Sequence, residues 1–314
     1  MAFDATNNTV YALDDTTAGF RRPSLELFSK IITIDPTDYP FFTLTGNSNT
    51  HNVTVEWQTR GLAARDKTNA AVEGAEYAYE DLAAPTRVSN TTQIFTKGVE
   101  VSGTAQAEAH YGVKNLMRDQ IDLRSTEMKG DFEAALISGD AEAAGDATTA
   151  RRMAGLEAIA GAASGQTESG GDAVLTETMF LNALKLVWNN GPKARDCMLG
   201  PNMQTVVNGF SADGATKWIN TVDKEVVNMV LVYQSSFGTI RFHLSRDVKD
   251  HATDTTAQVF VFDKSYLSKV WLRRPFMAKP AVTGDYIRSN MVAEMTFKYD
   301  DDQAMAIITG IKAE

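Results

Sequence analysis

The chain has 314 residues, of which 43% are hydrophobic, and its 40 acidic and 30 basic side chains give a formal net charge of −10 at pH 7. These proportions are typical of one large globular domain or two closely joined ones, and they exclude global disorder. Such an acidic chain argues against nucleic-acid binding through a large basic surface. The single cysteine, Cys197, excludes an internal disulfide and a multi-cysteine zinc site.

Membrane and export signals are missing from the sequence. No segment has the run of about 18 apolar residues that a membrane-spanning helix needs. Residues 1–15 have neither the basic nor the apolar region of a signal peptide. We therefore expect a protein made in the cytoplasm, with no membrane partner.

Residues 1–51 are interpreted as an N-terminal arm. They are polar at first, and an apolar run over 25–32 then predicts a short amphipathic piece that ends at Asp35-Pro36. Residues 37–50 predict an extended segment. Two interpretations stay open, a partly ordered terminus and an arm that docks on another surface.

Residues 52–101 are predicted to form an extended two-stranded loop. Val53, Val55 and Trp57 alternate with polar residues over 52–58, and the apolar residues of 91–101 indicate a second strand. The charged stretch between them shows little apolar periodicity and far exceeds the roughly 12–15 residues usual for a structureless loop. An isolated ribbon is marginal in water, so we expect it to need a partner surface, such as another copy. The candidate contact residues here are Arg60, Arg65, Lys67, Glu73, Glu76 and Arg87.

Residues 102–175 are expected to hold one long helix over 104–137, capped by Ser102 or Thr104. Its apolar residues recur every three or four positions, and charged residues, among them Glu133, are assigned to the remaining faces. At 1.5 Å per residue such a helix is about 50 Å long, which suggests a flat molecule. The Gly- and Ala-rich stretch 139–174 is interpreted as a flexible connection with one docked turn at its apolar residues.

Residues 176–270 show an α/β pattern that we expect to fold on its own. A helix runs from Thr176 or Thr178 to Gly191-Pro192, and a second helix covers 202–210. Buried strands are predicted over residues 197–199, 226–233, 239–244, 258–262 and 267–272. The tail 271–314 adds strands over 291–299 and 304–311, joined by an acidic turn at 300–302.

Little in the sequence supports catalysis. Cys197 lies in an apolar strand and is interpreted as an inert buried thiol. The four histidines lack the spacing of a metal site, and no phosphate loop or nucleophile elbow is present. Trp271 is predicted to be a packing residue. The pair Arg273-Arg274 fits a surface ion pair or an inter-subunit salt bridge. We expect no enzyme activity, no metal and no cofactor.

Several short motifs occur in a characteristic order. They are Ile34-Asp35-Pro36 with Pro40-Phe41, Glu56-Trp57, Glu73-Gly74, Trp271-x-Arg273-x-Pro275, Thr283-Gly284-Asp285, Glu294 and Gly310. In this order the chain resembles the major capsid proteins of tailed phages that have the Hong Kong 97 fold. The resemblance implies an α+β fold with an N-terminal arm (1–51), an extended β-hairpin loop (52–101), a peripheral domain with a spine helix (102–175), an α/β axial domain (176–270), and C-terminal strands (271–314) returning to the peripheral domain.

The same resemblance implies a structural function. Copies of the chain would form the hexamers and pentamers of an icosahedral head, assembled in the host cytoplasm, that encloses DNA without sequence-specific binding. Expected partners are a portal protein, a separate scaffolding protein and, in some heads, a decoration protein. Two alternatives stay open, the shell of a bacterial encapsulating compartment with the same fold and a soluble α/β enzyme.

Overall fold

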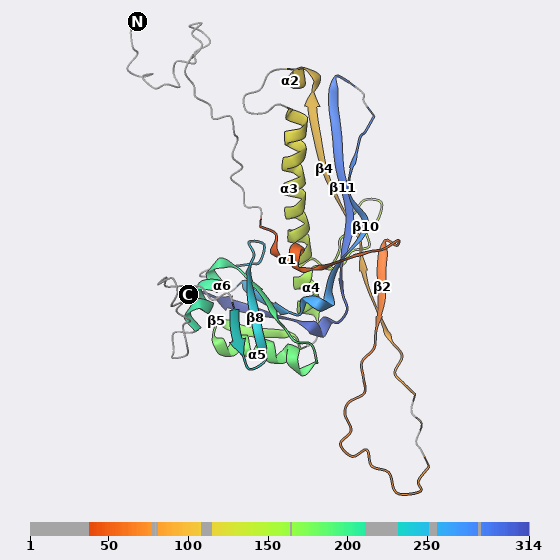
Figure 1. Ribbon diagram of the computed structural model, residues 1–314, viewed down its shortest axis with the longest axis vertical. Helices are drawn as coiled ribbons and strands as arrows, with labels where there is room; N and C mark the ends of the chain where they lie inside the picture. Colours follow the sequence, from red (N-terminus) through yellow and green to blue (C-terminus); the bar gives the residue numbers. More distant parts are fainter. Residues whose placement is uncertain are drawn as a thin grey trace, which may run out of the picture.

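The computed structural model describes residues 38–76, 79, 81–107, 115–163, 165–210, 232–250, 256–281 and 284–313. The chain forms a tall body, in which a long helix packs on a four-stranded sheet, and a round body built around a six-stranded sheet. A two-stranded ribbon with a long loop extends away from both, at the end opposite the tall body (Figure 1).

The tall body contains the sheet β1-β10-β11-β4, which is antiparallel except for the β1–β10 pair. Its strands are β1 (Gly46–Asn49), β4 (Gln93–Ser102), β10 (Leu267–Ala278) and β11 (Tyr286–Tyr299). On β4 the buried side chains of Phe95, Val99 and Val101 alternate with exposed residues, as expected for a sheet covered on one face. β10 is longer than predicted and contains Pro275, where irregular pairing with β11 removes the need for its missing N–H.

The long helix is shorter than predicted. The structure describes α2 (Gly103–Ala107) and α3 (Leu116–Ile137), while 108–114 lie outside the described residues. Asn115 has extended backbone angles and accepts a hydrogen bond from the amide of Arg118 at 3.0 Å, so α3 has its own N-cap and a continuous helix over 104–137 is wrong. The Ser102 hydroxyl, predicted as a cap, does accept from the Ala105 amide at the start of α2.

The round body is a six-stranded sheet in the order β5-β12-β9-β6-β8-β7. Its strands are β5 (Thr167–Val174), β6 (Asp196–Leu199), β7 (Val232–Ser235), β8 (Gly238–Leu244), β9 (Ala257–Phe262) and β12 (Met305–Lys312). Two helices, α5 (Glu177–Asn189) and α6 (Pro201–Phe210), pack on one face in a shared core. Thr176 caps α5 by accepting from the Met179 amide. Most of the predicted strand over 226–233 lies outside the described residues.

Two expectations about this sheet need correction. Residues 139–174 do contain the predicted docked turn, as helix α4 (Leu156–Ala162), but β5 at their end is an ordered strand paired with β12. Its glycines fit because a Cβ on Gly170 would lie 2.6 Å from the Gly310 carbonyl oxygen. β12 was grouped with strands returning to the tall body, yet it lies between β5 and β9. The segment 176–270 therefore lacks an inner strand of its own sheet.

The remaining elements connect these bodies. Helix α1 (Pro40–Leu44) and strand β1 lie against the tall body, and Phe41 is completely buried, so the described end of the arm docks on its own chain. The short helices η2 (Lys264–Tyr266) and η3 (Asp302–Ala304) precede β10 and β12. The ribbon pairs β2 (Thr54–Thr59) with β3 (Thr86–Thr91). The expected pairing of 52–58 with 91–101 is wrong, because β4 pairs with β11.

Candidate functional site

The loop between β2 and β3 is the most exposed part of the molecule. Every described residue from 60 to 87 is exposed to solvent. Five predicted contact residues lie there, namely Arg60, Arg65, Lys67, Glu73 and Glu76, and within the described ranges none of them takes part in a salt bridge.

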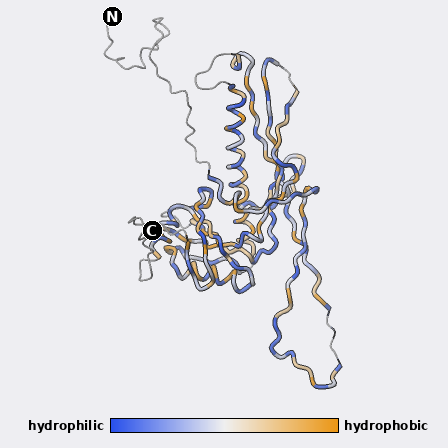
Figure 2. The backbone as a smooth tube through the Cα atoms, viewed as in Figure 1, coloured by the Kyte–Doolittle hydropathy of each residue, from blue (hydrophilic) through white to orange (hydrophobic). Residues whose placement is uncertain are grey.

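The loop also carries large apolar side chains, which sequence reasoning underestimated. The exposed fractions are 98% for Leu62, 81% for Val72, 92% for Tyr79 and 80% for Leu82. Figure 2 shows hydrophobic segments along the loop even though it lies away from both bodies. Apolar side chains clustered in solvent on one segment are typical of a surface that another molecule covers.

The base of the ribbon, in contrast, is firmly held. Trp57 packs edge-to-face on Tyr299, with ring centroids 5.2 Å apart. The side chain of Asn90 donates to the Phe297 carbonyl at 2.7 Å and accepts from the Ala154 amide at 3.0 Å. Arg87, the sixth predicted contact residue of the loop, lies 3.4 Å from Glu56 across the ladder, an exposed pair of small energetic value. The ribbon thus starts from a fixed platform and ends in an unsupported loop.

The arginine pair of β10 divides between two intrachain partners. Arg273 lies 2.8 Å from one oxygen of the buried Glu294, whose other oxygen lies 2.5 Å from Arg151. Arg274 donates to the side-chain oxygen of Asn49 at 3.2 Å. Arg273 therefore forms an ion pair within the chain, between a partly exposed guanidinium and a buried carboxylate. Glu294, quoted as part of a motif, is the acidic centre that ties three separated segments together.

A second buried carboxylate holds the arm, and sequence reasoning missed it. Helical periodicity places Glu133 outside the apolar face of the helix, yet it is completely buried and accepts from the amides of Phe41 at 2.9 Å and Phe42 at 2.6 Å. Burial raises the pKa of Glu133 to about 7, more than these two hydrogen bonds lower it. Lys269 donates to the carbonyls of Phe42 and Thr45, and burial lowers its pKa. Both ends of α1 are therefore fixed by buried ionisable side chains.

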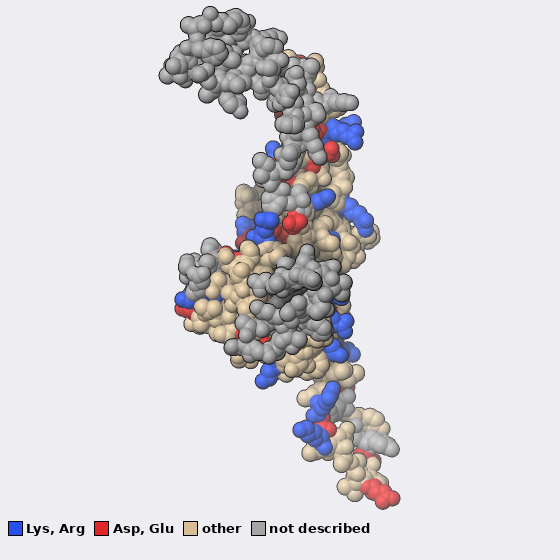
Figure 3. All heavy atoms as spheres, turned by 60° about the vertical axis from the view of Figure 1, so that its left-hand side comes forward, with Lys and Arg blue, Asp and Glu red and all other residues tan. Residues whose placement is uncertain are grey.

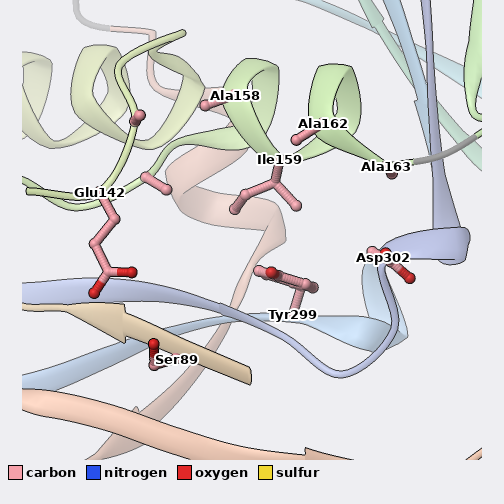
Figure 4. A pocket seen from close by; sticks show the side chains of 10 residues that line it. Ser89, Glu142, Ala158, Ile159, Ala162, Ala163, Tyr299 and Asp302 are labelled. Carbon is pink, nitrogen blue, oxygen red and sulfur yellow. The ribbon is translucent and has the colours of Figure 1, made fainter. Parts of the chain in front are cut away.

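One cavity of about 270 Å³ lies between α4, β3 and the end of β11 (Figure 4). Tyr299 and Ile159 face each other across it, and Glu142 and Asp302 stand at opposite ends in this view. Glu142 accepts from the Thr91 hydroxyl at 2.5 Å. Burial, and then the charges of Asp302 and Glu142, raise the pKa of Tyr299. Half of the ten lining residues are alanine and none is a histidine, cysteine or lysine, so the lining does not assemble a nucleophile and a base.

The other chemistry-bearing residues are dispersed. Cys197 is buried in β6 as predicted, and burial raises the pKa of its thiol. His243 lies 3.0 Å from Asp196, whereas His110 and His251 lie outside the described residues. Within the described ranges, no three His, Cys, Asp or Glu side chains group as metal ligands, and no helix has the length and apolar character to cross a membrane. Trp271 is 6% exposed, which confirms its predicted packing role.

Comparison with known proteins gives a consistent result. The family model described as SU10 major capsid protein matches residues 5–312. A curated relative, the major capsid protein of Escherichia phage Phieco32, is 37% identical over 111 residues, or 35% of this chain and 32% of that protein. The alignment thus spans about a third of the length of that relative.

Solved structures with the same fold cover almost the whole chain. The capsid of a native GTA particle matches with a TM-score of 0.64 and 12% identity over 97% of this chain and 99% of that one. The holo-SrpI encapsulin complex from Synechococcus elongatus PCC 7942 matches with a TM-score of 0.61 and 11% identity over 96% of each chain. The structure of Microbacterium phage Oxtober96 matches with a TM-score of 0.60 and 14% identity over 93% of this chain and 97% of that chain. At these identities the match shows the fold alone, an α+β fold of the Hong Kong 97 capsid type.

Proposed function

Because this chain belongs to the SU10 major capsid protein family, we propose that it assembles with copies of itself into the icosahedral head shell of a tailed phage, which encloses double-stranded DNA. Hexamers and pentamers of the chain would tile the shell. In this role the protein is a structural component of the virion and needs no catalytic site.

The observation that carries the proposal is the exposed loop between β2 and β3. Leu62 and Tyr79 in this loop are more than nine-tenths exposed. Within one chain, the contacts of the loop therefore do not offset the conformational entropy that is lost when the loop becomes ordered. Repeated copies in a closed shell change this balance, since many weak contacts act together once neighbours are held at high effective concentration. The candidate contacts of the loop, from Arg60 to Arg87, and the Arg273-Arg274 pair stay proposals of this kind.

Partners and location follow from the same role. We infer assembly in the host cytoplasm, a portal protein at one vertex, a separate scaffolding protein and, in some heads, a decoration protein. The net charge of −10 supports a wall that encloses DNA without sequence-specific contacts. The division into arm (1–51), loop (52–101), peripheral domain (102–175), axial domain (176–270) and C-terminal strands (271–314) stays a prediction, apart from β12.

A bacterial encapsulating compartment is the second candidate, since one matched structure is an encapsulin complex. The two functions differ in contents, because a compartment encloses protein cargo and a head encloses DNA. The family match and the curated phage relative favour the head.

The test is the product of assembly. The chain would be expressed alone and with the scaffolding gene of its own genome, and then examined by sedimentation and electron cryomicroscopy. We expect closed shells with five- and six-fold capsomers, and the particles of an infection to contain DNA. A protein that stays a monomer or small oligomer in both preparations contradicts the proposal, and shells that contain only protein cargo favour the compartment.

A further inference from the structure

A basic pocket lies at one edge of the round body, where β6 and β8 begin and β9 ends. Its volume is about 620 Å³, and four cationic side chains line it, Lys193, Arg195, Arg241 and Lys264. They come from the loop before β6, from β8 and from η2, so no short stretch of sequence reveals them as a group.

The four cations have no anionic partner among the described residues, because none of them belongs to a salt bridge there. The Arg241 amide donates to the Arg195 carbonyl at 2.8 Å, which brings the two backbones together at this edge, and the register places Asp196 directly opposite Arg241. In a chain of net charge −10, four exposed cations gathered in one pocket form a local site that suits an anionic partner.

The pocket has one acid and an apolar wall. Asp196 is buried, with one oxygen 3.0 Å from His243 Nε2 and the other without a partner in the described part of the chain. One carboxylate against four cations leaves the pocket positive. Trp188 is 44% exposed and packs on Phe237 with ring centroids 6.0 Å apart. The fitting partner therefore carries carboxylates together with apolar side chains.

The tip of the β2–β3 loop has this composition. Residues 73–81 contain four acidic residues, and no Lys or Arg occurs between Lys67 and Arg87. Glu73, Glu76 and Asp81 are exposed, and Val72 and Leu82 on either side are 81% and 80% exposed. Figure 3 shows acidic atoms at the far tip of the loop and basic atoms closer to the bodies. The loop extends away from the round body of its own chain, so its tip is placed to contact another copy (Figure 1).

We propose that the acidic tip of the β2–β3 loop (72–82) of one copy docks in the basic pocket of a second copy, with carboxylates on Arg195, Arg241 and Lys264 and apolar side chains on Trp188. The inference rests on the proposed function, because it requires copies held side by side. It assigns a defined receptor to the loop, and it brings the cations of the pocket together with an exposed acidic segment.

Charge reversal tests the docking. The double variant Arg195→Glu with Arg241→Glu, and separately Glu73→Lys with Glu76→Lys, should each lower the yield of shells at least tenfold at low salt. Combining both pairs should restore most of the yield. The control is Lys185→Glu with Arg246→Glu, which makes the same charge change at exposed positions of the round body outside the pocket. Equal loss in this control, or no recovery in the combined variant, contradicts specific docking.

Cross-linking tests the contact directly, since the natural Cys197 is buried and unreactive. Glu76→Cys and Ser236→Cys, at the tip and in the pocket lining, should be joined between chains by a short bismaleimide in assembled shells. Gln58→Cys in place of Glu76→Cys, on the fixed base of the ribbon, should give no such product. Normal shells without the 76–236 product overturn the docking and leave the proposed function standing. Failure of the unchanged chain to form any shell would instead refute the function.

Discussion

The round body and the β2–β3 loop use the same kinds of residues in opposite ways. In β9 every residue is buried, and in β12 Ile307, Ile308 and Ile311 are at most 1% exposed. In the loop, Leu62 is 98% exposed and Leu82 is 80% exposed. Burial of apolar area is the main favourable term in folding, so the first region supplies stability and the second does not.

This contrast indicates that the chain uses some of its interactions for folding and others for assembly. Segments that pair within the chain are closed by charged anchors, such as Glu294 between Arg151 and Arg273. The loop keeps its charges and apolar groups available for a neighbour. Variants of the two regions should therefore change different measurements, the melting transition for one and shell yield for the other.

The largest effect is expected from removing β12. Truncation after Asp301 deletes an inner strand whose isoleucines fill the cores on both faces of the six-stranded sheet. Loss of each such side chain costs about 2–5 kcal/mol, and a whole domain is stable by only about 5–15 kcal/mol. We expect no cooperative melting transition by circular dichroism. Truncation after Lys312, which leaves the strand intact, is the control, and a cooperative transition in the shorter protein would contradict the assigned sheet order.

The isolated fragment 176–270 is expected to fail for the same reason. It lacks β12 and β5, so the inner edge of β9 stays unpaired. We expect an aggregating or non-cooperative fragment. A sharp, reversible melt would show that β12 is dispensable and would restore the independent unit predicted from the sequence.

A smaller loss is expected for Trp271→Ala in the tall body. The indole packs on Phe132 with ring centroids 5.5 Å apart and donates to Asn47 at 3.3 Å. We expect a decrease of about 3–5 kcal/mol in the free energy of unfolding, measured by denaturant titration. Trp188→Ala is the matched control, because that indole is 44% exposed and should cost clearly less. Equal losses would place both residues in the same environment and contradict the burial assigned here.

Local patterns in the sequence predicted much of this fold, whereas the pairing of strands far apart in the chain could not be predicted from them. Alternation along residues 53–57 and 239–244 marks strands, and the Thr176 cap marks the start of α5, because these signals act within a few residues. The partners of β4 and β12 depend on contacts over many residues, so the pairing of the ribbon and the place of β12 were predicted incorrectly.

The candidate site divides in the same way. The charged loop was visible as an overlong segment with little periodicity, whereas its exposed apolar residues look ordinary in a sequence. Glu133 was missed because helical periodicity identifies a face but not what covers it, and only the fold places the amides of α1 over this carboxylate. The basic pocket was missed since its cations come from three segments.

A pH-dependent effect of intermediate size is expected at Glu133. Its pKa is raised to about 7 from 4.5, so the folded chain holds a proton between those values that the unfolded chain releases. The unfolded state then binds fewer protons, and stability falls as the pH rises from about 4.5 to 7. For Glu133→Gln this part of the pH dependence should disappear, on the order of 3 kcal/mol across the window, since a tenfold change in proton affinity corresponds to about 1.4 kcal/mol.

Denaturant titrations of both proteins at pH 5 and pH 8 measure the difference. Burial also raises the pKa of Asp247, and the charge of Asp247 in turn helps to raise the pKa of Glu133, so Glu133→Gln removes this coupling together with the titration of Glu133 itself. A pH dependence that is identical in the two proteins would mean that Glu133 keeps its charge in the fold.

The smallest effect on stability is expected from removing the loop itself. Thr59 pairs with Thr86, so a short Gly/Ser turn can replace residues 60–85 without disturbing the ribbon ladder. The described residues lost are all exposed, and a shorter loop closes at slightly lower entropic cost, so the free energy of unfolding should change by less than about 1 kcal/mol. Shell formation should nevertheless fail, seen as loss of the fast-sedimenting peak at an unchanged melting temperature.

As the control, a variant with a Gly/Ser segment of the original length should also melt normally and fail to assemble, because the side chains of the loop, rather than its length, make the contacts. Normal shells from either variant would show that assembly does not use this loop. An unfolded protomer would show that the loop belongs to the stability of the single chain, and the contrast between the two regions would then be lost.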